Sequence, residues 1–351
     1  MGATWRKTTC YLLLLSFISF LVTTRTAPAE EIRFGHAAPP YHGLHQGALA
    51  LAGLVEAGTG GRLKILVTPW GDLGPELSLL EQVQQGQLEM AAVSITTLAR
   101  LAPRAALFDL PFLWPSPHTA RLVLADPKVR ESLFSLARPL GLTPLGYTEN
   151  GFYDLTCTRR PLLRPQDLAG LKIRVEDSPA RFEAFRALGA EPVLLPAPMI
   201  RAALDQGVIQ AQENPLLTSI GLGLLENRPF LTLSRHGPGL GLIVVNTRFW
   251  RSLGPEPQRV FEEAAAECLR VNRAADQALV KKLPGLDLSL AEYLKAKGVK
   301  AARLGQAERE AFAAVLRPVW ENFGNTVDKG LHDLIMEKIK ENSVPGPEPA
   351  P

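Results

Sequence analysis

Hydrophobic and polar positions over residues 167–215 change period in a regular order, from short β-branched runs to helical spacing and back. The predicted strands and helices alternate along the chain at 171–175, 180–188, 192–195, 198–205 and 208–215. The first of these helices follows Ser178 and Pro179, which are favoured as an N-cap and as the first helical residue. It ends at Gly189, a residue typical of helix C-termini. This order predicts a βαβαβ unit with a parallel sheet.

The same order occurs near the start of the chain. Its strands and helices are predicted at 31–35, 46–58, 63–68, 75–84 and 90–94, again with short connections. A strand at 143–147 and a long helical run at 257–283 are predicted outside the two units. Ligands of such sheets bind outside the carboxyl ends of the strands, so residues that end these strands are the first candidates for a site.

The composition is that of an ordinary globular protein, with 46% hydrophobic and 21% charged residues in 351. A chain of this length favours two domains. Its start differs, because Arg6 and Lys7 precede an apolar run at 11–22 that ends before the small residues 27–29. A run of twelve residues is too short to cross roughly 30 Å of hydrocarbon. We therefore predict a signal peptide at 1–29, cleaved near Ala29, and an exported protein.

The formal net charge of +3 belongs to this signal segment, which holds three basic and no acidic residues. The rest of the chain has 35 basic side chains (38 minus 3) against 35 acidic ones. This balance gives no electrostatic reason to expect a nucleic-acid partner.

Two polar residues stand near the ends of strands in the second unit, Arg174 and Asn214. A guanidinium offers a planar fork of donors that fits a carboxylate, and an amide can add a further hydrogen bond. One interpretation is therefore an anion site for a small organic acid. The alternative is that Arg174 caps a surface and Asn214 turns the chain before Pro215.

Evidence for metal binding or catalysis is thin. His36, His42 and His45 suggest a metal site, but no further ligand at a fixed spacing supports it. Cys157 and Cys268 form no Cys-x-x-Cys motif, and two free thiols are expected. The chain shows no nucleophile elbow, phosphate loop or zinc-protease helix. We expect no cofactor, no metal site and no enzyme.

The runs DLAGLKIRV, FRALGAEPV and ALDQGVIQAQENP resemble the signature of the DctP family, the substrate-binding proteins of tripartite ATP-independent periplasmic (TRAP) transporters. The resemblance implies that Arg174 holds a ligand carboxylate and that Asn214 helps to bind the ligand. The run GHAAPPYHGLHQGA, which includes His36, is similar to the family's opening loop. Ser94 falls where the third strand of these proteins opens onto the pocket, and Asp177 joins the candidate ligand-binding residues.

Two stretches depart from the family pattern. In ENGFYDLTCTRRP, Tyr153 stands where the family commonly has a second arginine, so charge is missing where a dicarboxylate would need it. In LLPAPMI, Ala197 and Met199 stand where members often have an aromatic and an acidic residue. We count Tyr153 and Ala197 among the candidate ligand-binding residues. The run FDLPFLW matches a common family form, and we expect it to serve core and lobe packing more than ligand stacking.

The resemblance implies an α/β, two-lobed periplasmic-binding-protein-like fold with crossing segments and a long helix bracing both lobes. Lobe I is expected at 30–148 plus 236–275, lobe II at 149–235 plus 276–340, and a disordered tail at 341–351. The expected function is capture of a small organic acid in the periplasm and its delivery to small and large permease subunits. A receptor serving a sensor or another transporter type is the alternative, and a secreted enzyme is a weaker one.

Overall fold

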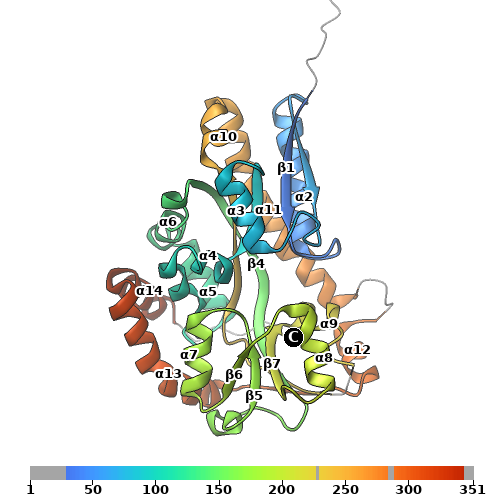
Figure 1. Cartoon of the computed structure of the whole chain (residues 1–351), viewed down its shortest axis with the longest axis vertical. Coiled ribbons are helices and arrows are strands. Elements are labelled where there is room, and N and C mark those ends of the chain that lie inside the picture. Colours follow the sequence, from blue (N-terminus) through green and yellow to red (C-terminus); the bar gives the residue numbers. More distant parts are fainter. Residues whose placement is uncertain (1–28, 227–228, 284–287, 344–351) are drawn as a thin grey trace, which may run out of the picture.

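The computed structural model describes residues 29–226, 229–283 and 288–343. The predicted signal peptide, apart from Ala29, lies outside the described residues. The chain folds into an upper and a lower lobe, which share strands and are seen in Figure 1. The predicted limits of the two lobes in the sequence stay a prediction.

The first predicted βαβαβ unit is confirmed. It consists of β1 (Glu30–His36), α2 (Gly43–Gly58), β2 (Leu63–Thr68), α3 (Glu76–Gln85) and β3 (Met90–Ser94). β1 pairs in parallel with both β2 and β3, which gives the strand order β2-β1-β3. His36 and Ser94 are therefore the last residues of neighbouring strands, at one edge of the upper lobe.

The second predicted unit is also confirmed. It consists of β5 (Lys172–Val175), α7 (Pro179–Ala187), β6 (Glu191–Leu194), α8 (Ile200–Asp205) and β7 (Ala211–Pro215). β5 pairs in parallel with β6 and β7, so the order β6-β5-β7 repeats the topology of the first unit. The last strand begins three residues later than predicted and ends at Pro215 as predicted, so Asn214 lies at its carboxyl end.

One long strand, β4 (Leu142–Cys157), passes through both lobes, where the sequence predicted only a short strand at 143–147. Its first part pairs with β9 (Pro238–Asn246), and its last part pairs with β7 and with β8 (Phe230–Leu233). β8 pairs in turn with β10 (Lys300–Arg303). β4 and the connection from β8 to β9 are thus the segments that join the two lobes, as the family resemblance implied.

The predicted long helix is α11 (Pro255–Lys281), which runs from the upper lobe down to α12 (Leu290–Ala296) in Figure 1. It packs on α2, on β4 and on α12. Its approach to α2 is close, because a Cβ at Gly47 would lie 2.5 Å from the carbonyl oxygen of Cys268. Glycine at this position lets the two helices touch.

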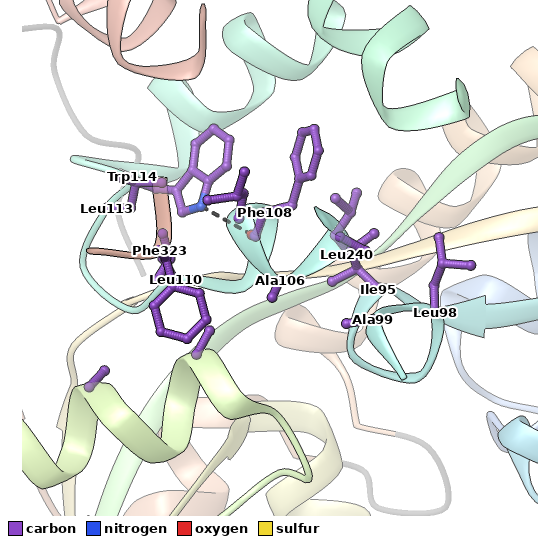
Figure 2. Packing of buried hydrophobic residues seen from close by; sticks show 14 of the residues in the cluster. Ile95, Leu98, Ala99, Ala106, Phe108, Leu110, Leu113, Trp114, Leu240 and Phe323 are labelled. Atoms are coloured by element: carbon purple, nitrogen blue, oxygen red, sulfur yellow. Dashed lines mark hydrogen bonds between the residues drawn. The ribbon is translucent and has the colours of Figure 1, made fainter. Parts of the chain in front are cut away.

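The remaining helices pack on the hydrophobic cores, most of them on the largest. They are α4 (Ile95–Ala99), α5 (Pro117–Ala125), α6 (Pro127–Ser135), α9 (Leu216–Gly221), α10 (Thr247–Ser252), α13 (Gln306–Val327) and α14 (Lys329–Asn342). The last helix extends two residues into the predicted disordered tail, of which residues 344–351 lie outside the described part. Figure 2 shows Phe108, Leu110 and Trp114 packed in this core, where the Trp114 indole donates to the Phe108 carbonyl. The interpretation of this run as core packing is confirmed.

Candidate functional site

Arg174 lies on β5, at the carboxyl edge of the lower lobe. Its Nε donates to the Leu195 carbonyl at 3.0 Å, and its Nη1 lies 3.5 Å from the Glu213 carbonyl. The side chain is 6% exposed, and the nearest carboxylate oxygen, on Glu176, is 3.8 Å away. Arg174 therefore does not cap a surface, and its guanidinium is held mainly by neutral carbonyl groups.

Asn214 lies on β7, opposite Asp154 of β4, and is buried. Its amide donates to the side-chain oxygen of Gln212. The Gln212 amide in turn donates to the hydroxyls of Thr156, at 2.8 Å, and Ser219, at 3.3 Å. This chain of hydrogen bonds orients the Asn214 side chain before any ligand arrives.

A buried charge network lies beside these two residues and consists of Asp109, Arg181, Glu213 and His236. Arg181 of α7 binds Asp109 through Nε and Nη2, at 2.9 and 2.6 Å, and binds Glu213 through Nη1 at 2.6 Å. The same oxygen of Glu213 lies 2.7 Å from Nε2 of His236, whose Nδ1 meets the Ser234 hydroxyl at 2.8 Å. The side chains of Arg181, Glu213 and His236 are fully buried.

The Arg181 guanidinium offsets much of the negative charge of the two carboxylates in this network. Burial would raise the pKa of Glu213, but the Arg181 guanidinium and the hydrogen bond with His236 outweigh it and lower that pKa to about 2. Burial lowers the pKa of His236 more than Glu213 raises it. Burial would also lower the pKa of Arg181, yet Asp109 and Glu213 hold it well above its usual value. Arg181 and Glu213 are therefore charged at neutral pH.

Tyr153, the residue in place of the family's second arginine, lies under Arg181. The guanidinium carbon stands 3.6 Å from the centroid of the Tyr153 ring, which is the geometry of a cation–π contact. Burial raises the pKa of Tyr153 well above its usual value, so the phenol is neutral. The positive charge missing from β4 is thus supplied next to it by α7.

The upper lobe presents different chemistry at the ends of its strands. His36 is fully buried, its Nε2 lies 3.1 Å from Nδ1 of His45, and burial lowers its pKa to about 4. The Ser94 hydroxyl donates to Glu76 Oε2 at 2.6 Å, and Thr97 donates to the same oxygen at 2.8 Å. This edge therefore holds neutral imidazoles and one half-buried carboxylate.

The other two predicted residues lie at the margin of the lower edge. Ala197 stands in a 3-10 turn two residues beyond the Leu195 carbonyl that Arg174 binds, and it packs against Ile200 and its neighbours. The Asp177 carboxylate forms an exposed ion pair with Arg100, which follows α4 in the upper lobe. The structure therefore places Arg174, Asn214, Tyr153 and Ala197 on neighbouring elements of the lower lobe, and Asp177 forms an ion pair with the upper lobe.

A cavity of about 330 Å³ lies elsewhere, between Tyr41, α9, the end of α11 and α12. Its walls are mainly leucine and isoleucine side chains with Tyr293, Glu226 and Lys297, and none of the predicted site residues lines it. Tyr41 of the upper lobe reaches α9 here, because a Cβ at Gly221 would lie 2.3 Å from its hydroxyl. The two lobes are in contact at this point.

Sequence reasoning missed Asp109, Arg181, Glu213 and Glu76. The signal was weak, because Asp109 is a single acidic residue inside the apolar run FDLPFLW, and Glu213 is a single acidic residue at the end of a predicted strand. Such residues are buried only when paired, yet the sequence does not say with which partner. Arg181 looked like an ordinary residue in the first turn of a helix.

Metal or disulfide chemistry finds no support in the described part of the chain. Within 29–226, 229–283 and 288–343, no three His, Cys, Asp or Glu side chains are grouped so that they could hold a metal ion. Cys157 and Cys268 are both free and buried. None of the helices in these ranges is long and apolar enough to cross a membrane.

Comparison with known proteins now assigns the class. Residues 34–326 match the DctP family model, "Bacterial extracellular solute-binding protein, family 7". The match covers most of the chain, and the chain belongs to this family. It is a TRAP solute-binding protein with the mixed α/β periplasmic-binding-protein fold, and a binding protein rather than an enzyme.

Three relatives illustrate the likeness. The 2,3-diketo-L-gulonate-binding periplasmic protein YiaO of Escherichia coli is 32% identical over 262 residues, which are 75% of this chain and 79% of YiaO. The sugar acid binding protein of Advenella mimigardefordensis, solved with galactonate, is 28% identical with a TM-score of 0.80, covering 90% of this chain and 99% of that one. A TRAP periplasmic solute-binding protein of Shewanella oneidensis, with bound succinate, is 27% identical with a TM-score of 0.78, covering 89% and 100%.

Proposed function

We propose that this chain is a periplasmic receptor that captures a small hydroxylated monocarboxylic acid between its two lobes. It would then deliver the acid to the small and large permease subunits of a TRAP transporter. The observation that carries the proposal is the buried Arg174, held by carbonyl oxygens at the carboxyl edge of β5, with the Asn214 amide oriented on the neighbouring strand β7.

The electrostatics at Arg174 favour a carboxylate ligand. The Arg174 guanidinium donates its hydrogen bonds to neutral carbonyls, and its ion pair with Glu176 is beyond hydrogen-bond distance at 3.8 Å, so its charge is only partly compensated. A ligand carboxylate would supply the missing close partner. The pairing would strengthen as the lobes exclude water, because charges interact more strongly where the effective dielectric constant is lower.

The rest of the site favours hydroxyl groups over a second carboxylate. Tyr153 carries no charge, and Arg181 beside it is already bound to two carboxylates. At the upper edge, Glu76 would accept hydrogen bonds from hydroxyls and repel an anion. The diketogulonate- and galactonate-binding relatives show that the family accepts sugar acids, which have this pattern of one carboxylate and several hydroxyls.

Location in the periplasm is supported by two observations. The first 29 residues have the pattern of a signal peptide with cleavage near Ala29. Several relatives are named as periplasmic proteins, among them YiaO and the C4-dicarboxylate-binding DctP of Rhodobacter capsulatus. A receptor in this compartment would meet its ligand before the permease does.

The test is a thermal-shift and calorimetric screen of the mature chain against galactonate, erythronate, glucuronate, diketogulonate, pantoate and succinate. A ligand that binds the native state raises the melting temperature. We expect sugar acids to give the largest shifts, succinate little or none, and Arg174→Ala to abolish the shift. Arg160→Ala is the matched control, because Arg160 is exposed and binds only the Asp167 carbonyl. Equal binding by Arg174→Ala, or no shift with any carboxylate, would refute the proposal.

A further inference from the structure

We propose that Arg181 is a positioning residue for the ligand site, acting through Glu213 on Arg174. The inference rests on the proposed function, because it concerns how the carboxylate site is held in its binding geometry. Arg181 itself would touch no ligand atom. Its donors go to Asp109 and Glu213, its plane covers the Tyr153 ring, and its side chain is fully buried.

Glu213 connects Arg181 to the ligand site in three ways. Arg181 binds one of its carboxylate oxygens, and Glu213 reaches the site through its other carboxylate oxygen, its carbonyl oxygen and its place next to Asn214. Its Oε2 is bound by Arg181 at 2.6 Å, and its Oε1 lies 3.4 Å from the backbone N–H of Glu176. Its carbonyl oxygen lies 3.5 Å from Nη1 of Arg174. It also precedes Asn214 on β7, so a turn of the Glu213 backbone would move that amide as well. Fixing the Glu213 side chain therefore fixes both residues proposed to hold the carboxylate.

The same chain of contacts reaches the upper lobe. Asp109 is bound by Arg181 on one side, and the Thr96 hydroxyl donates to its Oδ2 at 3.3 Å on the other. Thr96 belongs to α4, the helix capped by Ser94. Arg181 is thus the link between the strand ends of the upper lobe and those of the lower lobe, at the place where a ligand would have to contact both.

The contacts of Arg181 require a guanidinium and would not be made by another positively charged group. Three nitrogen atoms are used at once, two on Asp109 and one on Glu213. A lysine ammonium is a single point of charge and cannot span both carboxylates with the same planar fork. Arg181→Lys keeps the charge of the buried site while loosening Glu213, so it tests position separately from charge.

The experiment measures the Kd for galactonate, or for whichever acid of the panel binds most tightly, well below the melting point of every variant. We expect Arg181→Lys to weaken binding about tenfold, a typical coupling within one hydrogen-bonded network. In the Arg174→Lys background, the same change should cost little more, because its effect passes through Arg174. Arg186→Lys on the same helix is the control, since that side chain is exposed and pairs with Glu183.

The outcomes separate the two proposals. If Arg174→Lys weakens binding but Arg181→Lys leaves the Kd unchanged, Arg181 is structural only and the positioning role is wrong. If Arg181→Lys raised the Kd by the same factor in the wild-type and the Arg174→Lys backgrounds, its effect would not pass through Arg174. If Arg174→Lys itself binds normally, the proposed carboxylate site fails instead. Should Arg181→Lys not fold, the double variant Arg181→Lys with Asp109→Asn removes one buried charge and allows the same Kd comparison.

Discussion

The strand ends of the upper and lower lobes have the same topology and opposite chemistry. Both sheets place three parallel strands in the order second, first, third of their unit. The upper edge ends in neutral histidines and in Glu76, whereas the lower edge ends in Arg174 and Asn214 above a buried charge network. The repeated fold gives each lobe a place for ligand atoms, and the side chains decide which atoms go there.

The difference shows how a binding protein divides recognition between its lobes. An edge with a fixed positive charge selects the carboxylate, and an edge with acceptors and neutral donors suits the hydroxyls. The buried charge network behind the lower edge holds Arg174 in place. Behind the upper edge, α2 is pressed on α11 through glycine contacts and packs against a hydrophobic core. The following predictions test this division.

The largest effect is expected at the lower edge. Arg181→Met would leave Asp109 and Glu213 buried without their counter-charge and should lower the free energy of unfolding by about 3–5 kcal/mol. Arg186→Met on the same helix should change it by less than about 0.5 kcal/mol, because that residue is exposed. Denaturant unfolding measures both. A loss below about 1 kcal/mol for Arg181→Met would contradict the importance of buried charge here.

Behind the upper edge, the expected sensitivity is to volume. A Cβ at Gly47 would lie 2.5 Å from the Cys268 carbonyl oxygen, so Gly47→Ala must push α2 from α11. We expect a loss of about 1–3 kcal/mol in thermal unfolding, with ligand affinity nearly unchanged. Gly53→Ala on the same helix is the matched control, because nothing lies within 4 Å of its Cβ position. That variant should be neutral or slightly stabilised.

Acid should weaken the upper edge through His42. This residue caps α2 by accepting the Leu44 N–H on Nδ1, and burial lowers its pKa to about 4. A lowered histidine pKa contributes stability that is complete above about 6.5 and is lost as the pH falls towards 4. His42→Asn keeps a capping group but cannot titrate.

Between pH 7 and 4.5, wild type should therefore lose on the order of 2 kcal/mol more than His42→Asn. Asp276, whose Oδ1 lies 3.9 Å from His42, has a pKa raised by burial to about 7 and titrates in the opposite sense. Both proteins contain Asp276, so the difference between their free energies of unfolding at each pH is less affected by its titration. If the free energies of unfolding of wild type and His42→Asn fell in parallel with pH, His42 would not be the titrating group.

The smallest effect is expected where the two edges meet at the surface. The Arg100–Asp177 pair joins the lobes but is about half exposed, so Asp177→Asn should cost about 0.2–1 kcal/mol in ligand affinity. The wild-type advantage should disappear at about 1 M salt, where screening reduces the Debye length to about 3 Å. Calorimetry at low and high salt measures this. An advantage that persists in salt would instead favour direct contact between Asp177 and the ligand.

Local pattern predicted the fold well, because helix caps, glycine stops and β-branched runs act over a few residues. The two βαβαβ units and the long helix are confirmed with small shifts of their ends. The continuous strand β4 was missed, because Gly151 and a polar stretch at its centre are typical of a turn. In the structure, irregular pairing between Glu149 and Phe152 lets the strand continue from one lobe into the other.

Site residues were predicted only where the residue type and its position at a strand end indicate ligand binding. Arg174 and Asn214 stood out at strand ends and are found on paired strands, each held by hydrogen bonds. Arg181 did not, because its partners Asp109 and Glu213 lie 72 and 32 residues away and are fixed only by tertiary packing. Tyr153 was recognised as a departure from the family, yet its meaning became visible only with Arg181 above its ring.

A crystal structure of the mature chain with a bound sugar acid would show which lobe holds the carboxylate. We expect the ligand carboxylate within hydrogen-bond distance of the Arg174 guanidinium and the Asn214 amide, with hydroxyls directed towards Glu76. A carboxylate bound at the upper edge beside His36, with hydroxyls on Arg174, would contradict the division of recognition between the two lobes.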